Sequence, residues 1–274
     1  MKNKVVVITG AGGVLCSAFA KEVAKHGAKV ALLDLNLAAA QKHADEITAK
    51  GGVAKAYEAD VLNREKLEAV RGLVNKDLGK CDILINGAGG NSPKATTDKE
   101  YYFYGDIQSG AKTFFGLDKA GFSFVFDLNI MGTIIPSQVF MQDMLGREGC
   151  SVLNISSMNA FKPLTKIPAY SAAKSGVSNF TQWLAVHFAK EGIRVNAIAP
   201  GFFVTQQNAV LLYDADQKPT PRTGKILAAT PMGRFGNDEE LLGALMFLID
   251  EKKSSFITGI VLPVDGGFSA YSGV

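Results

Sequence analysis

Short apolar runs rich in Val, Ile and Leu alternate with stretches of helical periodicity along most of this 274-residue chain. Strands that are apolar on both faces are typical of a parallel sheet covered by helices on either side. The pattern therefore predicts an α/β fold with one doubly wound parallel sheet of Rossmann type, of about seven strands, in a single domain over residues 1–274. The expected strands are residues 5–9, 29–34, 53–60, 81–86, 151–156, 193–200 and 258–265.

Charge and cysteine content narrow the class of protein. The net charge is only +3 and the basic residues are scattered, so neither nucleic acid nor an anionic membrane is an expected partner. No uninterrupted apolar stretch approaches the ~18 residues that a membrane span needs, and a strand-like run follows Met1 too closely for a signal peptide. Cys16, Cys81 and Cys150 lack metal-ligand spacing, which indicates reduced thiols, no metal site and a cytoplasmic protein.

Two connections are longer than a minimal fold of this type requires, near residues 91–125 and 201–236. Ligands of open α/β sheets bind beyond the carboxyl ends of the strands, where such connections emerge. We expect both to be walls or lids of a substrate site. Contact between subunits, or simple surface decoration, is the alternative.

The stretch TGAGGVLC follows the first expected strand and opens a helical pattern. Its glycines, Gly10, Gly12 and Gly13, would let backbone amides and a helix N-terminus face a dinucleotide phosphate, although a plain tight turn is also common. Asp34 ends the second strand, where a carboxylate can bind the ribose hydroxyls of NAD and repel the 2′-phosphate of NADP. A helix N-cap is the alternative role for Asp34.

A second signal lies in Tyr170-Ser-Ala-Ala-Lys174. Tyr170 and Lys174 are neighbours on one helix face, and the ammonium would lower the tyrosine pKa enough to make the hydroxyl a usable proton donor or acceptor. Taken alone, such a pair is most often a surface feature. Ser171 and Lys174 also match an acyl-transfer signature, SxxK, but the companion motifs of that signature are absent.

Further motifs accompany this pair: NGAGG at 86–90, NIMG at 129–132, two serines ending a strand at 156–157, and APG at 199–201. With them the chain resembles the short-chain dehydrogenase/reductase family over nearly its whole length. The resemblance implies that Tyr170 transfers a proton, Ser157 polarises the substrate oxygen, Lys174 holds the nicotinamide ribose and lowers the tyrosine pKa, and Asn129 orders a water in the proton relay.

The same resemblance implies NAD(H) as cofactor. Val14 and Cys16 stand where the family turn, TGxxxGxG, has its second and third glycines, so we expect a variant but working turn. The expected cofactor contacts are Gly10, Gly12, Gly13, Val14, Leu15, Asp34, Asp60, Val61, Asn86, Gly87, Ala88, Pro200, Gly201 and Thr205.

Several stretches, among them INGAGGNSPKATT and SMNAFKPLTKIPAYSAAK, also resemble the subgroup of D-mannonate oxidoreductases, or fructuronate reductases. That resemblance implies reversible reduction of D-fructuronate to D-mannonate. A sugar acid needs hydrogen bonds and a cation for its carboxylate. The expected substrate contacts are Asn91, Lys94, Asn159 and Arg222, with Lys162 and Arg234 as further basic candidates.

Two alternatives stay open: a dehydrogenase of another polyol or keto-sugar acid, such as a gluconate type, and an NAD-sensing protein without turnover. The family resemblance also implies a homotetramer packed through the helices after Asn129 and around Tyr170. A stripe at helical spacing, Phe180, Trp183, Leu184, His187 and Phe188, fits either core or subunit interface.

Overall fold

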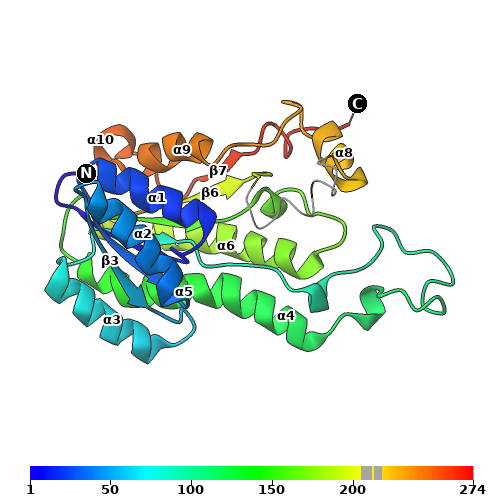
Figure 1. Ribbon diagram of the computed structural model, residues 1–274, viewed down its shortest axis with the longest axis horizontal. Coiled ribbons are helices and arrows are strands. Elements are labelled where there is room, and N and C mark those ends of the chain that lie inside the picture. Colours follow the sequence, from blue (N-terminus) through cyan, green and yellow to red (C-terminus); the bar gives the residue numbers. More distant parts are fainter. Residues whose placement is uncertain (205–211, 213–217, 274) are drawn as a thin grey trace.

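The computed structural model describes residues 1–204, 212 and 218–273. Its centre is one sheet of seven strands, all pairs of which are parallel, in the order β3-β2-β1-β4-β5-β6-β7 (Figure 1). The order reverses between β1 and β4, which is the switch point where ligands of this architecture bind. The predicted fold class is therefore confirmed. The strands are β1 Val5–Thr9, β2 Lys29–Asp34, β3 Val53–Glu58, β4 Ile83–Asn86, β5 Ser151–Ile155, β6 Arg194–Pro200 and β7 Val261–Val264.

Helices cover both faces of this sheet because successive strand residues point to opposite sides. Val6 and Ile8 of β1 join one apolar layer, and Val5 and Val7 join the other. The first layer is closed by α1 Val14–Lys25, α2 Leu37–Ala49 and α9 Glu239–Ile249. The second is closed by α3 Arg64–Asp77, α5 Gly132–Phe140 and α6 Pro168–His187.

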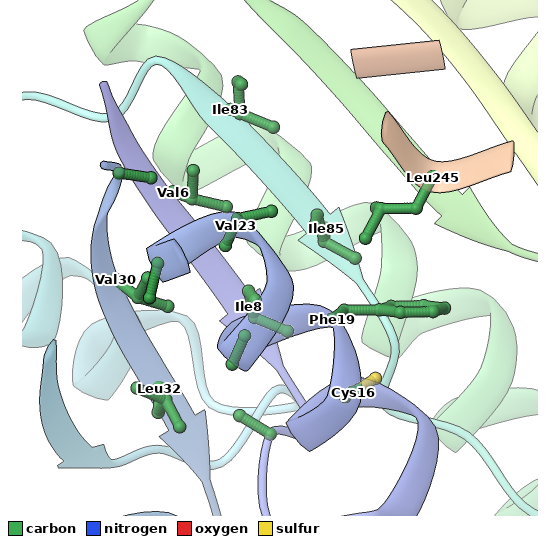
Figure 2. Packing of buried hydrophobic residues seen from close by; sticks show 14 of the residues in the cluster. Val6, Ile8, Cys16, Phe19, Val23, Val30, Leu32, Ile83, Ile85 and Leu245 are labelled. Carbon is green, nitrogen blue, oxygen red and sulfur yellow. The ribbon is translucent and has the colours of Figure 1, made fainter. Parts of the chain in front are cut away.

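The packing of α1 fixes the position of the connection that leaves β1 toward β2. Phe19 is fully buried against the layer that contains Ile8 and Ile85, and Cys16 lies in the same layer one turn earlier (Figure 2). Burying a side chain of this size contributes about 2–3 kcal/mol relative to exposure. The glycine turn between β1 and α1 is thus held from both sides by the core.

Most predicted boundaries shift by only a few residues. β1 and β2 begin and end as predicted, whereas β3 stops at Glu58 and β7 covers only Val261–Val264. Asn36 and Asn63 cap α2 and α3 by accepting hydrogen bonds from the amides of Ala39 and Lys66. Within the described ranges, the remaining helical elements are η1 Pro93–Ala95, η2 Phe114–Gly116, α4 Lys119–Phe126, η3 Asp127–Met131, η4 Met141–Asp143, η5 Met158–Ala160, η6 Ala189–Glu191, α8 Pro221–Ala228 and α10 Glu251–Ser254.

The first long connection forms a projection, which we call the aromatic arm (residues 97–117). Figure 1 shows it extending away from the body before the chain returns into α4. Inside the arm, the buried Asp106 binds the ammonium of Lys99 at 2.6 Å and accepts a hydrogen bond from the Phe103 amide at 2.9 Å. Its outer surface is apolar, with Tyr101, Tyr102, Phe103, Tyr104, Ile107, Phe114 and Phe115 exposed.

The helical run Lys119–Asp143 is long and apolar enough to cross a membrane by length and composition, with a mean hydropathy of 1.3. Half of its most apolar 18-residue window is buried within the protein, where α4 packs on α6 and α5 packs on α3. The run also carries Asn129. Its apolar character is accounted for by this packing between the sheet and neighbouring helices.

Candidate active site

The glycine turn lies at the switch point and is tied to the end of β2. Gly10 has φ +66°, and a Cβ there would lie 2.9 Å from the backbone of Ala88. The Gly12 amide donates to Asp34 Oδ2 at 2.9 Å, and a Cβ on Gly12 would lie 2.8 Å from that of Ala39. Glycine is therefore required at both positions by the closeness of neighbouring backbone and side chains.

Asp34 does not cap a helix. Its second oxygen accepts a hydrogen bond from the Asn36 amide at 2.9 Å, and Asn36 is the residue that caps α2. The alternative role considered for Asp34 is thus wrong. The carboxylate stays half-buried at the carboxyl end of β2, between the glycine turn and α2.

The substitutions at Val14 and Cys16 are accommodated locally. Val14 is the first residue of α1, so its amide and that of Leu15 lie in the first helical turn, where backbone N–H groups have no partner within the helix. A Cβ on Gly87 would overlap Cys16 Sγ, so the glycine missing at position 16 is matched by one at position 87. Burial raises the pKa of the Cys16 thiol to about 12, which keeps it neutral.

The segment after β4 runs beside this turn. Thr9 Oγ1 accepts hydrogen bonds from the amides of Gly87 at 3.1 Å and Ala88 at 3.3 Å. The Asn86 side-chain amide donates to Ser137 Oγ and Asn154 Oδ1, and its oxygen has no hydrogen-bond partner in the described residues. Asn86 therefore joins β4 to β5 and α5.

Sequence reasoning missed the network to which Asn86 belongs. Asn154 donates to Thr181 Oγ1 at 2.9 Å, which links β5 to α6, and both side chains are fully buried. A polar Asn within the apolar run SVLNIS was the available signal. The network links β4, β5, α5 and α6, and predicted catalytic residues lie after β5 and on α6.

The other predicted cofactor residues occupy the same edge. Val61 is buried against Gly132 at the start of α5, and Asp60 binds the amide of Leu62 at 2.9 Å. Pro200 ends β6, and a Cβ on Gly201 would lie 2.6 Å from Asp265 Cα. Thr205 lies outside the described residues.

Lys174 is buried one turn after Tyr170 on α6. Its ammonium donates to the Ile155 carbonyl at 2.8 Å and lies 5.7 Å from the centre of the Tyr170 ring. A Cβ on Gly89 would lie 3.1 Å from the Lys174 nitrogen and 2.7 Å from Asn129 Oδ1, so Gly89 leaves room for both groups. Burial lowers the pKa of Lys174 to about 8.

Asn129 lies in η3, a π-helical turn between α4 and α5. Its amide nitrogen donates to the carbonyls of Gly90 and Val125, each at 2.7 Å, and its oxygen accepts from the Gly90 amide at 3.3 Å. The side chain therefore clamps the segment after β4 beside Lys174. Single π-helical turns of this kind are frequent at functional sites.

Tyr170 lies in the first turn of α6, and the nearby Ser157 hydroxyl acts on its pKa. Burial raises the pKa of Tyr170 and the Ser157 hydroxyl offsets this only in part, so the lowering expected from Lys174 is not found. The reason is distance, because the ammonium is directed to the Ile155 carbonyl. Ser171 Oγ donates to the Ile167 carbonyl at 3.1 Å, which argues against a serine–lysine nucleophile.

The substrate candidates are dispersed. Asn91 and Lys94 are exposed, and Asn91 donates to Thr96 Oγ1 at 3.1 Å. Asn159 is buried two residues after Ser157, and its side-chain oxygen has no hydrogen-bond partner in the described part of the chain. Arg222 lies exposed on α8.

Two basic candidates are occupied elsewhere. Lys162 donates to the carbonyls of Phe268 and Tyr271 and lies over both aromatic rings. Arg234 forms a two-point ion pair with Glu240, at 2.7 and 2.8 Å. Neither side chain is free to bind a substrate carboxylate in this arrangement.

A hollow of about 430 Å³, the substrate-side cavity, opens beside the first turn of α6. Its walls come from the connections that follow β4, β5 and β6 and from Phe268 after β7. Both long connections therefore contribute to it, through Thr96 and Glu100 in one and Phe202 and Arg222 in the other.

The fold and this edge define a nucleotide-binding oxidoreductase with a buried serine and lysine and a half-buried tyrosine. Residues 4–215 match the family model for short chain dehydrogenases. The chain belongs to the short-chain dehydrogenase/reductase family, whose members use a nicotinamide dinucleotide.

Relatives cover the whole chain. A Haemophilus influenzae protein provisionally assigned as a D-mannonate oxidoreductase, solved with bound NAD, is 62% identical with a TM-score of 0.97, covering 100% of this chain and 98% of that one. An uncharacterized oxidoreductase of Bacillus subtilis is 52% identical over 100% of this chain and 98% of its own. A 2-dehydro-3-deoxy-D-gluconate 5-dehydrogenase of Formosa agariphila is 31% identical, over 100% and 95%.

Proposed function

We propose that the protein is an NAD(H)-dependent oxidoreductase that interconverts D-fructuronate and D-mannonate. The observation that carries the catalytic part is the arrangement of Lys174, buried beside Asn129 and Gly89, with the Tyr170 ring 5.7 Å from its ammonium and the Ser157 hydroxyl near Tyr170. The similarity to a Haemophilus protein assigned as a D-mannonate oxidoreductase supports the substrate.

The residues of the turn fit a dinucleotide. The turn has no side chain beyond hydrogen at Gly10, Gly12 and Gly13, and the first turn of α1 carries no acidic residue that would repel a phosphate. Asp34 would hold the ribose hydroxyls and disfavour a 2′-phosphate. Pro200, Gly201 and Thr205 are proposed neighbours of the carboxamide, and Asp60 and Val61 of the adenine.

The chemistry then divides among this chain's own residues. The nicotinamide, when bound, supplies or accepts the hydride. Ser157 holds the substrate oxygen and Tyr170 gives it a proton, so that a ketone becomes an alcohol; in the reverse direction Tyr170 accepts the proton. Lys174 contributes its positive charge beside the ribose, and Asn129 orders a water through the clamp described above.

Two further properties belong to the proposal. The stacked rings of Phe180, Trp183 and His187 line an apolar hollow with α5, and Trp183 is more than half exposed. This face supports the homotetramer expected for the family. Cys16, Cys81 and Cys150 are buried free thiols, which supports a reducing compartment such as the cytoplasm.

The test is to mix purified protein with NADH and D-fructuronate and to follow the loss of absorbance of the reduced nicotinamide. NADPH and fructose are the controls, and we expect turnover with NADH and the uronate alone. Absence of turnover, with NADH binding retained in a fluorescence titration, would discard the substrate and keep the cofactor site. Absence of NADH binding would discard the cofactor site.

The second candidate is a dehydrogenase of another keto-sugar acid, which the 31% identity to the Formosa gluconate enzyme favours. An assay with NAD+ in place of NADH, on 2-dehydro-3-deoxy-D-gluconate and D-gluconate, separates the two by the gain of absorbance of the reduced nicotinamide. A non-catalytic NAD sensor would turn over none of these compounds while still binding NADH.

A further inference from the structure

The substrate-side cavity has more positive than negative charge. Three basic side chains line it, Lys166, Arg222 and Lys225, against one carboxylate, Glu100. Its other walls are largely apolar and include Leu164, Ile167, Ile226, Phe202 and Phe268. Low-polarity walls strengthen the attraction between a cation and an anionic ligand.

The four charged groups are not equivalent. The Lys225 ammonium binds Glu100 Oε1 at 2.7 Å, and this contact holds the pKa of the Glu100 carboxyl below its usual range. The pair is therefore neutral overall. Lys166 and Arg222 make no side-chain hydrogen bond or ion pair with any residue in the described ranges, so the uncompensated charge belongs to them.

The cavity adjoins the proton-transfer end of the site. Ile167 caps α6 and accepts a hydrogen bond from the Ser171 amide, so the cavity wall is continuous with the turn that carries Tyr170. Phe202 follows directly after Pro200 and Gly201, the segment proposed to lie beside the carboxamide. A ligand in this cavity would lie between Ile167, three residues before Tyr170, and the residues of α8.

We propose that Arg222, with Lys166 in the wall of the same cavity, binds the carboxylate of an acidic substrate there. The inference rests on the proposed function and adds which residues recognise the acid group. Of the basic residues considered from sequence, Lys162 and Arg234 are engaged by the C-terminal segment and by Glu240. The guanidinium suits the task because its paired N–H groups match the two oxygens of a carboxylate.

The experiment measures equilibrium binding by calorimetry to the NADH-loaded protein. The probes are D-mannonate and D-gluconate, with D-mannitol as a matched neutral polyol. The variants are Arg222→Gln and Arg222→Lys, and the control is Arg64→Gln, at an exposed arginine on α3 that pairs with Glu68. Loss of a charged hydrogen-bonded partner predicts about 10- to 100-fold weaker binding of both acids to Arg222→Gln.

We expect Arg222→Lys to recover part of that loss, because it keeps the charge without the two-point geometry. Mannitol binding should be unchanged in every variant, and the control should match the parent protein. The proposal is overturned if the parent protein binds no hexonate, if Arg222→Gln binds the acids normally, or if it loses acid and mannitol equally.

The two proposals fail separately. Hexonate binding through Arg222 without turnover of D-fructuronate would reject the proposed reaction and keep the carboxylate site. Turnover of D-fructuronate with an unchanged KM in Arg222→Gln would reject the carboxylate site and keep the reaction.

Discussion

At the carboxyl edge of the sheet, the cofactor side and the substrate side differ in how their side chains are held. On the cofactor side, Asp34, Asn129 and Lys174 are fixed by hydrogen bonds of 2.7–2.9 Å to nearby backbone. On the substrate side, Arg222 is exposed on a long connection. The proposed chemistry would thus rest on groups that are fixed before a ligand arrives, and the proposed specificity on groups that solvent still reaches.

The largest effect should come from the fixed side. We expect Tyr170→Phe to lower kcat/KM by about 10³-fold, because proton transfer through a positioned side chain contributes 10²–10⁴-fold. NADH binding, followed by fluorescence, should be retained. Tyr104→Phe, at a fully exposed tyrosine of the aromatic arm, is the control. Normal turnover by Tyr170→Phe would mean that the chemistry does not rest on the fixed groups of the cofactor side.

The second effect concerns the cost of burying Lys174. Its pKa falls from 10.5 to about 8 on folding, so the unfolded chain binds more protons between these values. The destabilisation is complete below pH 8 and fades as the pH rises toward 10.5. Relative to Lys174→Met, the parent protein should gain about 2 kcal/mol in free energy of unfolding between pH 7 and pH 9.5.

Urea unfolding at several pH values measures this difference, with Lys190→Met at an exposed lysine as the control. A difference that does not vary with pH would mean that Lys174 keeps its ordinary pKa. The fixed side of the site would then be less strained than the structure indicates.

The smallest effect is expected in the aromatic arm. Tyr104→Ser should change the free energy of unfolding by less than about 0.5 kcal/mol, because the side chain is fully exposed. Phe19→Ala, in the core, should cost about 3–5 kcal/mol by comparison. Thermal unfolding measures both. A loss of several degrees for Tyr104→Ser, dependent on protein concentration, would show that another chain packs on the arm.

The sequence predicts the cofactor side of the site better than the substrate side. The reason is that part of the cofactor side depends on interactions between residues close in the sequence. Val5–Thr9 and Lys29–Asp34 are strands as predicted, because apolar periodicity is local. The position of Tyr170 and Lys174 on one helix face is local too. The ion pair of Arg234 is also short-range, with Glu240 six residues away, but no periodic pattern marks it.

Other features depend on contacts between distant segments. Asn86 meets Asn154, Lys225 meets Glu100, and the ammonium of Lys174 is drawn to the Ile155 carbonyl. The upward shift of the Tyr170 pKa depends on burial and on the contact between the Lys174 ammonium and the Ile155 carbonyl. Such pairings follow from the order of the strands, which a single sequence does not state.

The attachment of Lys162 has a practical consequence for handling the protein. Through the carbonyls of Phe268 and Tyr271, it fastens the C-terminal segment to the loop between β5 and α6 that carries Ser157. In Figure 1 the first residues lie at the far end of the molecule from this segment. An affinity tag is therefore better placed before Met1 than after the C-terminal residues, where it would crowd the loop that carries Ser157.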